Sequence, residues 1–415
     1  MRSDMSSHPT DRVSKAANDH QRGLSNVMLS DAEVQTIRSR FPVFQRQIHL
    51  CSCTKGALSD AVEAGLQEFM RLWHQNGIPW KIWMEKYESI RHSFAKFIGA
   101  KPEEIAVIYS TSQGISEIAS ALRFEQRKKV VMGELDFPAS GHIWLTQKLR
   151  GAEVTFLDSV DNRVPIESYE RAIDRNTLIV PVAHVSYKNG ARSEVEGIVQ
   201  VAHDNGAYVI VDGYQVCGTE PVDVHALDAD FYVTGTLKYL LGSPGLAFLY
   251  VKESLIESLR PTVTGAFAQR TLFQDTLKNF EPATTARRFE MGTPAMPSIY
   301  GSAAALDLLT EIGLENVAGH IKNLRSALVE GLRDMNVVIK TPVEHAGPMV
   351  VVKTIDSEAL ASKLAEHNII ASAKFDGLRI AFHVYNTLDD VRAVLKGLEQ
   401  NLDLVALEPE PSVSA

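Results

Sequence analysis

Cysteine is scarce in this sequence, and several familiar catalytic motifs are missing from it. The 415 residues include three cysteines, too few for a disulfide framework, which favours a reducing, cytoplasmic environment. No apolar run reaches the roughly 18 residues that a membrane-spanning helix needs. The sequence has no G-x-x-x-x-G-K-[ST] loop, no H-E-x-x-H motif and no G-x-S-x-G elbow. We therefore expect no membrane span, no P-loop nucleotide chemistry and no metal site.

Basic residues are outnumbered as well. Lysine and arginine total 42 against 51 aspartate and glutamate, which gives a formal net charge of −9. This balance argues against nucleic acid or an anionic membrane as the main partner, although a local basic pocket for a small anion is compatible with it. Residues 1–29 are polar and lack the apolar stretch of a secretory signal, so we expect a disordered tail there and a second at 406–415.

The apolar pattern indicates an α/β protein with a large and a small domain. Two helical patterns lie between residues 57 and 98, and seven short apolar runs then alternate with helices. Strands that are apolar throughout are typical of a mainly parallel sheet covered on both faces. We expect a seven-stranded large domain over residues 57–294. The pattern then changes to two long helices followed by alternating strands and helices, which predicts a small α+β C-terminal domain over 295–405.

Unusual polar residues follow the first and fifth of the predicted strands. Ligands of open α/β sheets bind at the carboxyl ends of strands. Ser110, Thr111 and Ser112 open a helix, where hydroxyl and N–H groups suit a phosphate, although Ser and Thr are also the commonest helix caps. Asp212 ends a wholly apolar strand and Gln215 follows it. The aspartate is compatible with a buried, partnered carboxylate or with an Asp-Gly turn.

Two basic residues are placed equally unusually. Lys238 follows an apolar strand that contains Thr234, and Thr236 lies between them. A lysine in a dry pocket has a lowered pKa and attacks aldehydes, whereas a structural lysine packs its stem and keeps its charge in water. Arg379 lies inside an apolar strand. Its guanidinium suits a carboxylate bound through two parallel hydrogen bonds, or a structural ion pair.

Taken in order, these residues predict the binding of an amino acid to pyridoxal phosphate. Lys238 would hold the aldehyde as a Schiff base, and Asp212 would keep the pyridine nitrogen protonated so that the ring accepts electrons. Arg379 would bind the substrate carboxylate. The remaining candidate contacts to the cofactor and its phosphate are Thr111, Ser112, Thr234 and Thr236.

The same residues lie in segments that resemble the class V aminotransferase family of fold-type I pyridoxal-phosphate enzymes. That family includes cysteine desulfurases, isopenicillin-N epimerases and kynureninases. The resemblance covers about residues 41–400. It rests on "FAKFIGAKPEEIAVIYSTSQGI", "HVSYKNGARSEVEGIVQVAHDNGAYVIVDGYQ", "DFYVTGTLKYLLGSPGLAFLYV", "RRFEMGTPAMPSIYG" and "LRIAFHVYNT".

The resemblance implies further roles for individual residues. Gln215 would contact the ring hydroxyl, and Phe137 would stack over the ring, unless it is a plain core residue. "FEMGTP" implies a homodimer in which Thr293 reaches the partner's phosphate, unless it is an ordinary turn. His184 and Tyr187 are candidates for assisting proton transfer near the substrate, with a structural histidine as the alternative.

The N-terminal segment and one departure from the family pattern bear on the reaction. Residues 30–56, which include Cys51 and Cys53, match the segment that lines the substrate mouth, although a cysteine is more often a small buried hydrophobe. Desulfurases carry a nucleophilic cysteine shortly before the region matching "LRIAFHVYNT". Here the corresponding "NIIASAKFDG" is short and has none, which makes persulfide chemistry of that kind doubtful.

The resemblance thus implies a homodimeric enzyme that acts on an amino acid through an external aldimine and a Cα carbanion. Transamination is favoured over kynureninase- or desulfurase-like cleavage and over epimerisation. A non-catalytic regulatory relative is the alternative from another class. The presence of both Lys238 and Asp212 counts against it.

Overall fold

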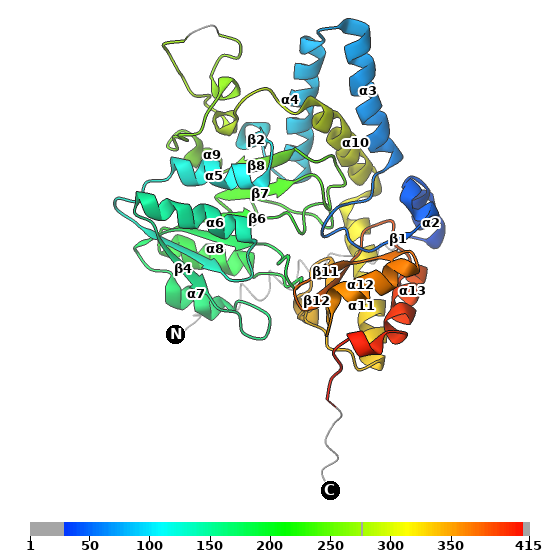
Figure 1. The fold of residues 1–415 in the computed structure, drawn as a ribbon. Coiled ribbons are helices and arrows are strands. Elements are labelled where there is room, and N and C mark those ends of the chain that lie inside the picture. Colours follow the sequence, from blue (N-terminus) through cyan, green and yellow to red (C-terminus); the bar gives the residue numbers. More distant parts are fainter. Residues whose placement is uncertain (1–28, 275–276, 410–415) are drawn as a thin grey trace, which may run out of the picture.

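The computed structural model describes residues 29–274 and 277–409, so most of both expected tails lies outside the described residues (Figure 1). Within these ranges, no helix combines the length and apolarity needed to cross a membrane.

A seven-stranded sheet forms the centre of the fold, and all seven expected strands are confirmed. Its order is β2-β8-β7-β6-β5-β3-β4. Pairs from β7 through β4 are parallel, whereas β8 runs antiparallel to both β2 and β7. The strands are β2 (Ile105–Ile108), β3 (Lys129–Gly133), β4 (Glu153–Leu157), β5 (Thr177–Ala183), β6 (Tyr208–Asp212), β7 (Phe231–Gly235) and β8 (Ala247–Val251).

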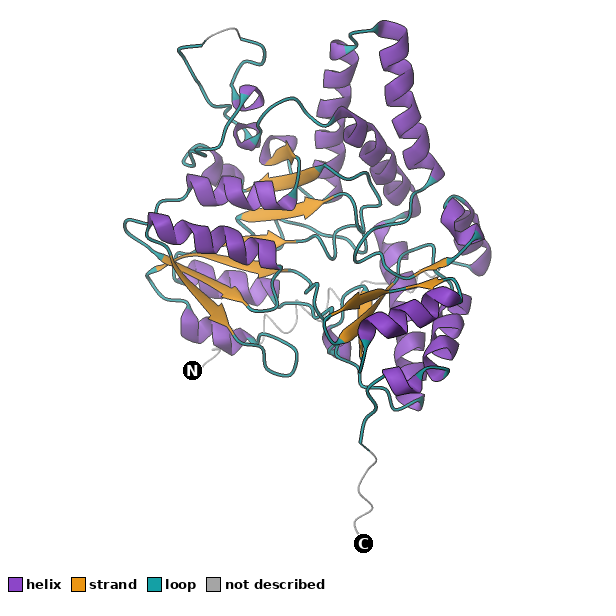
Figure 2. Cartoon of the chain, viewed as in Figure 1, coloured by secondary structure: helices purple, strands orange, loops and turns teal. Residues whose placement is uncertain are grey.

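Helices cover both faces of this sheet, as the apolar strands predicted (Figure 2). Successive side chains of a strand point to opposite faces, so Val209 and Val211 of β6 enter one hydrophobic cluster and Ile210 enters the other. Helices α4 and α8 contribute to the first cluster, and α5 and α6 to the second. The helices of this region are α4 (Trp80–Phe97), α5 (Thr111–Ala121), α6 (Pro138–Thr146), α7 (Ile166–Ala172), α8 (Val195–Asp204) and α9 (Glu253–Ile256).

A pair of long helices, α3 (Asp60–Asn76) and α4, rises away from the sheet in Figure 1. Helix α10 (Met296–Ile312) packs along both of them. Gly65 makes this close approach possible, because a Cβ there would lie 2.6 Å from the carbonyl oxygen of Tyr300. Helix α10 therefore ties the C-terminal part of the chain to the large unit.

The C-terminal unit has an antiparallel sheet of order β11-β12-β9. The N-terminal segment packs on this unit, because β1 pairs with β10 and the Arg38 guanidinium binds both carboxylate oxygens of Asp390 at 2.8 and 3.0 Å. The elements are α2 (Asp31–Ser39), β1 (Ile48–His49), α11 (Leu314–Asp334), β9 (Met349–Lys353), α12 (Ser357–Glu366), β10 (Ile369–Ile370), β11 (Ser372–Lys374), β12 (Gly377–Ala381) and α13 (Leu388–Glu399).

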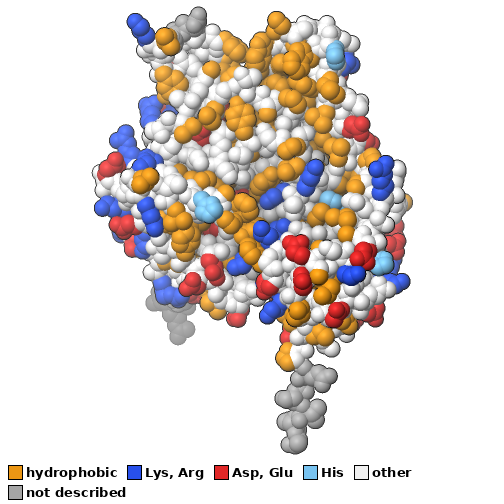
Figure 3. All heavy atoms as spheres, viewed as in Figure 1, with side chains coloured by type: hydrophobic (Ala, Val, Ile, Leu, Met, Phe, Trp, Pro, Cys, Tyr) orange, Lys and Arg blue, Asp and Glu red, His pale blue; other side chains and the backbone are white. Residues whose placement is uncertain are grey.

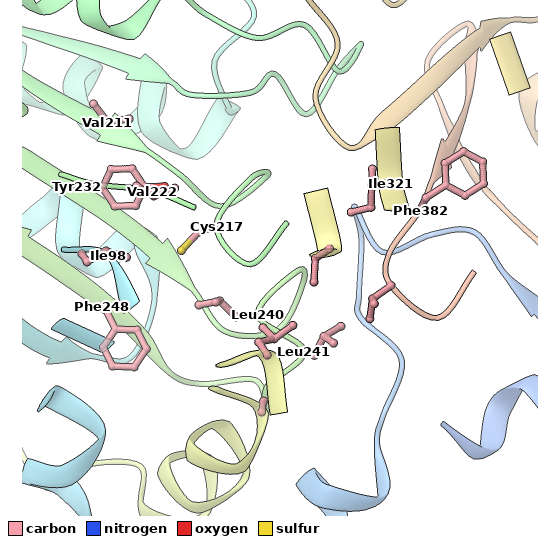
Figure 4. Packing of buried hydrophobic residues seen from close by; sticks show 14 of the residues in the cluster. Ile98, Val211, Cys217, Val222, Tyr232, Leu240, Leu241, Phe248, Ile321 and Phe382 are labelled. Carbon is pink, nitrogen blue, oxygen red and sulfur yellow. The ribbon is translucent and has the colours of Figure 1, made fainter. Parts of the chain in front are cut away.

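One hydrophobic cluster connects the two units. Figure 4 shows Leu240 and Leu241 between Tyr232 of the large sheet and Ile321 and Phe382 of the C-terminal unit. The loop after β7 is therefore anchored in the core on both sides. The division of the chain at residues 57 and 295 stays a prediction.

Candidate active site

Lys238 lies in the loop that connects β7 to β8. Thr236 closes this loop, because its hydroxyl donates to the carbonyl oxygens of Ser243 at 2.6 Å and Leu246 at 3.1 Å. The Lys238 carbonyl in turn accepts a hydrogen bond from the N–H of Leu241 at 3.1 Å. The hydroxyl proton of Thr236 is thus engaged within the loop, and its expected contact with a phosphate stays a prediction.

The Lys238 side chain is partly exposed, and its amine lies near two aromatic rings. Nζ lies 4.1 Å from the ring centroid of Tyr214 and 5.6 Å from that of Phe137. Burial lowers the pKa of Lys238, and the charge of Asp212 partly opposes this shift. A lowered pKa increases the fraction of neutral amine, which is the nucleophilic form. The lowered pKa thus favours a reactive amine, while the partial exposure of Lys238 leaves open the alternative of a packed stem with its charge in water.

Asp212 ends β6 at the carboxyl edge of the sheet. Its Oδ1 accepts a hydrogen bond from the Tyr214 N–H at 2.9 Å. Burial raises the pKa of Asp212, while this hydrogen bond and the nearby Lys238 amine act in the opposite direction. Asp212 is thus partly buried with a basic group near it, and its bond to the Tyr214 N–H also forms the local turn that an Asp-Gly sequence favours.

A second carboxyl group, Asp136, lines the same cavity as Asp212 and Phe137. Its two oxygens accept hydrogen bonds from the N–H groups of Ala183 at 2.6 Å and Gly133 at 3.1 Å, which ties the end of β5 to the end of β3. Burial raises the pKa of Asp136 to about 7, and the charge of Asp212 adds to the shift. We did not predict Asp136, although it too follows the carboxyl end of an apolar strand.

Tyr214 was also missed. Its ring occupies a space that exists only because residue 235 is glycine, since a Cβ on Gly235 would lie 2.5 Å from Cζ of Tyr214. Tyr214 thus contacts both predicted cofactor residues: its backbone N–H binds Asp212, and its ring faces Lys238. In the sequence it appears as an ordinary aromatic residue between Gly213 and Gln215, without a distinguishing signal.

Phe137 is not a core residue, because 44% of it is exposed. It precedes α6, and its ring meets that of Tyr187 edge-on with centroids 4.9 Å apart. Burial raises the pKa of the Tyr187 hydroxyl, and the charge of Arg379 partly opposes this. The rings of Phe137 and Tyr187 therefore form a wall beside Lys238.

Neutral groups hold the guanidinium of Arg379. Nη1 donates to the carbonyl oxygen of Tyr187 at 3.1 Å, and Nη2 donates to the hydroxyls of Thr54 at 3.0 Å and Ser372 at 2.6 Å. The buried Nε has no partner in the described part of the chain, and no carboxylate there forms an ion pair with Arg379. The alternative of a structural ion pair is thus excluded for the described residues, and the positive charge is free for an anion.

Other buried polar atoms near these residues also lack partners within residues 29–274 and 277–409. They include Oε1 of Gln215, whose Nε2 donates to the Cys53 carbonyl at 3.0 Å, Nδ1 of His184 and the hydroxyl of Tyr239. Burial lowers the pKa of His184 to about 4, so its imidazole is neutral. Cys53 is buried and Cys51 partly exposed, and burial raises the pKa of the Cys51 thiol to about 12.

At the start of α5, one residue caps the helix and two others have free hydroxyls. Ser110 is the cap, because its hydroxyl accepts the N–H of Gln113 at 3.1 Å. The hydroxyls of Thr111 and Ser112, both partly exposed, have no hydrogen-bond partner in the described part of the chain. These two side chains are therefore not needed as caps and are available to an anion at the helix start.

The last two threonine candidates lie differently. Thr234 is 1% exposed within β7, and its hydroxyl makes a long contact of 3.5 Å with the carbonyl of Gly235 and a hydrogen bond with the Cys217 thiol. Thr293 is exposed, and its carbonyl accepts the Tyr109 hydroxyl at 2.7 Å. The structure thus does not bring Thr293 beside Lys238 within this subunit, and its contact with a partner's phosphate stays a prediction.

Comparison with known proteins identifies the family of this chain. A family model described as aminotransferase class-V matches residues 74–394. The chain belongs to this family. It is 34% identical to an uncharacterized aminotransferase, YcbU, of Bacillus subtilis over 86% of this chain and 94% of that protein. It is 29% identical to a cysteine desulfurase of Haloferax volcanii over 77% of this chain and 80% of the other.

Among solved structures, a mutant of C-DES with glycine covalently linked to its pyridoxal-phosphate cofactor has a TM-score of 0.81 at 19% identity. The alignment covers 87% of this chain and 98% of that one. This class V family enzyme has the expected fold-type I architecture, and pyridoxal phosphate is its cofactor. The residues present fit that cofactor: a reactive amine, a partly buried acid, unpaired polar atoms of Gln215 and His184, and a helix start with free hydroxyls.

Proposed function

We propose that this enzyme transfers the amino group of an α-amino acid, with Lys238 as the catalytic residue. Bound pyridoxal phosphate supplies an electron sink for the pair left when a bond to the substrate Cα breaks. The observation that carries the proposal is the Lys238 amine, whose pKa burial lowers, near the partly buried acid Asp212. Its neutral form accepts the Cα proton as a general base. The resulting ammonium then donates the proton as a general acid to an atom other than Cα, because return to Cα would give epimerisation.

The other residues act by binding and positioning. Asp212 would hold the ring nitrogen through its carboxylate, Gln215 would bind the ring hydroxyl, and Phe137 would cover the ring. The free hydroxyls of Thr111 and Ser112 would bind the phosphate. Thr236 could join them only by giving up a bond within its own loop, because its hydroxyl and its backbone N–H both donate there. The support is their position: Asp212 and Phe137 share one cavity, and Oε1 of Gln215 is otherwise unpaired in the described part of the chain.

Arg379 binds the α-carboxylate, because its charge is free and its neutral partners orient it. Near neutral pH the imidazole of His184 is neutral and the hydroxyl of Tyr187 is protonated. Both side chains are therefore uncharged and suited to hydrogen bonding. Both assist the positioning of the substrate proton in this proposal.

Cleavage at the substrate side chain is the second candidate, because the Haloferax volcanii relative is named a cysteine desulfurase. Two features weigh against the persulfide form of that reaction. The β10–β12 segment carries no cysteine, and burial keeps the Cys51 thiol protonated. Epimerisation is a third outcome of the same bond breaking.

Incubation of the holoenzyme with single amino acids separates these reactions. Amino-group transfer converts the cofactor to its amine form, seen in the visible spectrum, until an added keto acid restores it. A lyase releases a fragment of the side chain and an epimerase inverts Cα, and both keep the aldehyde form. Side-chain products or inversion without amine-form cofactor would contradict the proposal.

We further propose a homodimer in the cytoplasm. Apolar side chains are exposed at the tip of the α3–α4 pair and on the loop beside it, including Ile78 at 81% and Phe273 at 67% (Figure 3). The rings of Trp80 and Phe273 contact each other across this region with centroids 6.0 Å apart. Exposed apolar patches of this kind mark interaction surfaces. The three free cysteines support a reducing compartment.

A further inference from the structure

A row of three aromatic rings leads from the candidate active site to the surface. The ring of Phe137 lies 5.6 Å from the Lys238 amine, that of Tyr187 lies 4.9 Å from Phe137, and that of Phe375 lies 6.5 Å from Tyr187. Phe137 and Phe375 are 44% and 58% exposed. The row therefore forms an apolar wall that begins at the lysine and ends in solvent.

Phe375 occupies its position at a cost. It lies at the tip of the β11–β12 hairpin, where Lys374 pairs with Gly377 and two residues make the turn. Its φ is +54°, in the left-handed region that bulky side chains rarely adopt and where glycine is normally favoured. Folding gains little from an exposed ring in a strained backbone. Such an outlier points to a functional reason for the side chain.

Two ammonium groups flank the outer ring. Nζ of Lys374 lies 5.2 Å and Nζ of Lys188 lies 6.0 Å from the ring centroid of Phe375. Cations at this distance are attracted to the face of an aromatic ring, which favours one orientation of Phe375. Basic side chains also border the seam between the two units on the face drawn in Figure 3.

The wall is joined to the predicted carboxylate site. Tyr187 is the middle ring of the row, and its carbonyl oxygen accepts a hydrogen bond from Nη1 of Arg379 at 3.1 Å. An amino acid whose carboxylate binds Arg379 and whose Cα lies near Lys238 therefore has the row beside its side chain. Aromatic rings gain most from stacking or edge contacts with such a surface.

We propose that this wall selects α-amino acids with an aromatic side chain and that Phe375 is a specificity-determining residue. The proposal rests on the proposed function, since it assumes an amino-acid substrate.

The test compares Phe375→Ser with a matched control, Ile355→Ser, which changes a 72% exposed apolar residue of the C-terminal unit outside the row. We expect the wild-type holoenzyme to prefer phenylalanine over alanine in kcat/KM. Phe375→Ser should reduce this preference by roughly 3- to 10-fold, the scale of one lost aromatic contact. Ile355→Ser should leave the preference unchanged. Equal use of both amino acids by the wild type, or an unchanged preference in Phe375→Ser, would overturn the proposal.

Binding measurements separate this proposal from the proposed function. By calorimetry, 3-phenylpropionate, which has no amine to react, should bind the holoenzyme more tightly than propionate, and Phe375→Ser should remove most of the difference. This result would support the wall even if no amino acid changed the cofactor spectrum. Equal binding of the two acids would overturn the wall alone. A preference for glutamate that Lys188→Ser and Lys374→Ser abolish would overturn it in favour of an anionic side chain.

Discussion

Neutral partners around a buried cation are unusual, and Arg379 has three of them. A guanidinium in an apolar strand costs hydration, and proteins normally offset this cost with a carboxylate. Here the offset within the described residues comes from a carbonyl and two hydroxyls, which orient the group without cancelling its charge. We therefore predict that the carboxylate of a substrate completes the pairing.

Replacement of this residue tests its assignment. Arg379→Ala should raise KM for amino acids by a factor equivalent to roughly 2–4 kcal/mol, the scale of losing a paired charge contact. Arg379→Lys should recover part of the loss, because it restores charge but not the planar two-point contact. Steady-state kinetics with amino acids and with amines that lack a carboxylate make the comparison. If the native enzyme uses both substrate types equally well, Arg379 does not bind the carboxylate.

Sequence reasoning found residues whose chemistry contrasts with their surroundings. Each of three charged residues lies within or at the end of an apolar run: Lys238, Asp212 and Arg379. In the structure, all three are at least partly buried. The sequence alone could not identify Tyr214, because the position of its ring depends on the space left by Gly235 at the end of β7. The sequence also could not show which hydroxyls are free to bind a ligand, because this depends on hydrogen-bond partners elsewhere in the chain.

At the scale of elements, the segment between β12 and α13 holds the lysine loop in place. The His383 Nε2–H donates to the carbonyl oxygen of Tyr239 at 2.8 Å, and Nδ1 accepts the N–H of Val384 at 2.7 Å. Tyr239 is the residue after Lys238, so this contact positions the loop directly. In the neutral ring, both nitrogens thus form hydrogen bonds. A proton added to Nδ1 would point at the N–H of Val384, which is itself a donor, and would break that bond.

This arrangement makes the stability of the fold sensitive to acid. Burial lowers the pKa of His383 to about 4, below the unfolded value of about 6.5. Between these values the folded protein binds fewer protons than the unfolded chain, so stability is fully present above pH 6.5 and is lost as pH falls towards 4. The difference corresponds to about 3 kcal/mol.

Urea unfolding of the native protein and His383→Gln at pH 7 and pH 4 checks this contribution. The variant should be less stable at pH 7 and should lose about 3 kcal/mol less than the native protein on acidification. His142→Gln, which changes an exposed histidine on α6, is the control. Equal acid sensitivity of His383→Gln and the native protein would show that His383 does not remain neutral in the fold.

The sheet was more predictable than the connections between distant elements. Seven apolar runs identified seven strands, because strands buried on both faces need apolar residues at every position. The parallel pairing of Ile48–His49 with Ile369–Ile370 had no such signal. The two segments are far apart in the chain, and each is too short for a periodic pattern to show.

At the scale of the whole molecule, the exposed apolar tip of the α3–α4 pair is the clearest feature that a single subunit leaves unexplained. If a second copy covers it, Ile78→Asp should place charges in the interface and shift the protein towards the monomer. Sedimentation velocity of the holoenzyme measures this shift. Leu149→Asp, which changes an apolar residue that is 94% exposed elsewhere, is the matched control. A monomeric native protein, or a dimer unchanged by Ile78→Asp, would contradict this interface.

The account depends most on the bond between Lys238 and the cofactor. Reduction of the holoenzyme with borohydride, followed by digestion and peptide mass spectrometry, tests it directly, because reduction makes the linkage permanent. We predict a phosphopyridoxyl group on Lys238 and its absence from Lys238→Ala treated in the same way. A phosphopyridoxyl group on another lysine of the native protein, with Lys238 unmodified, would contradict the account.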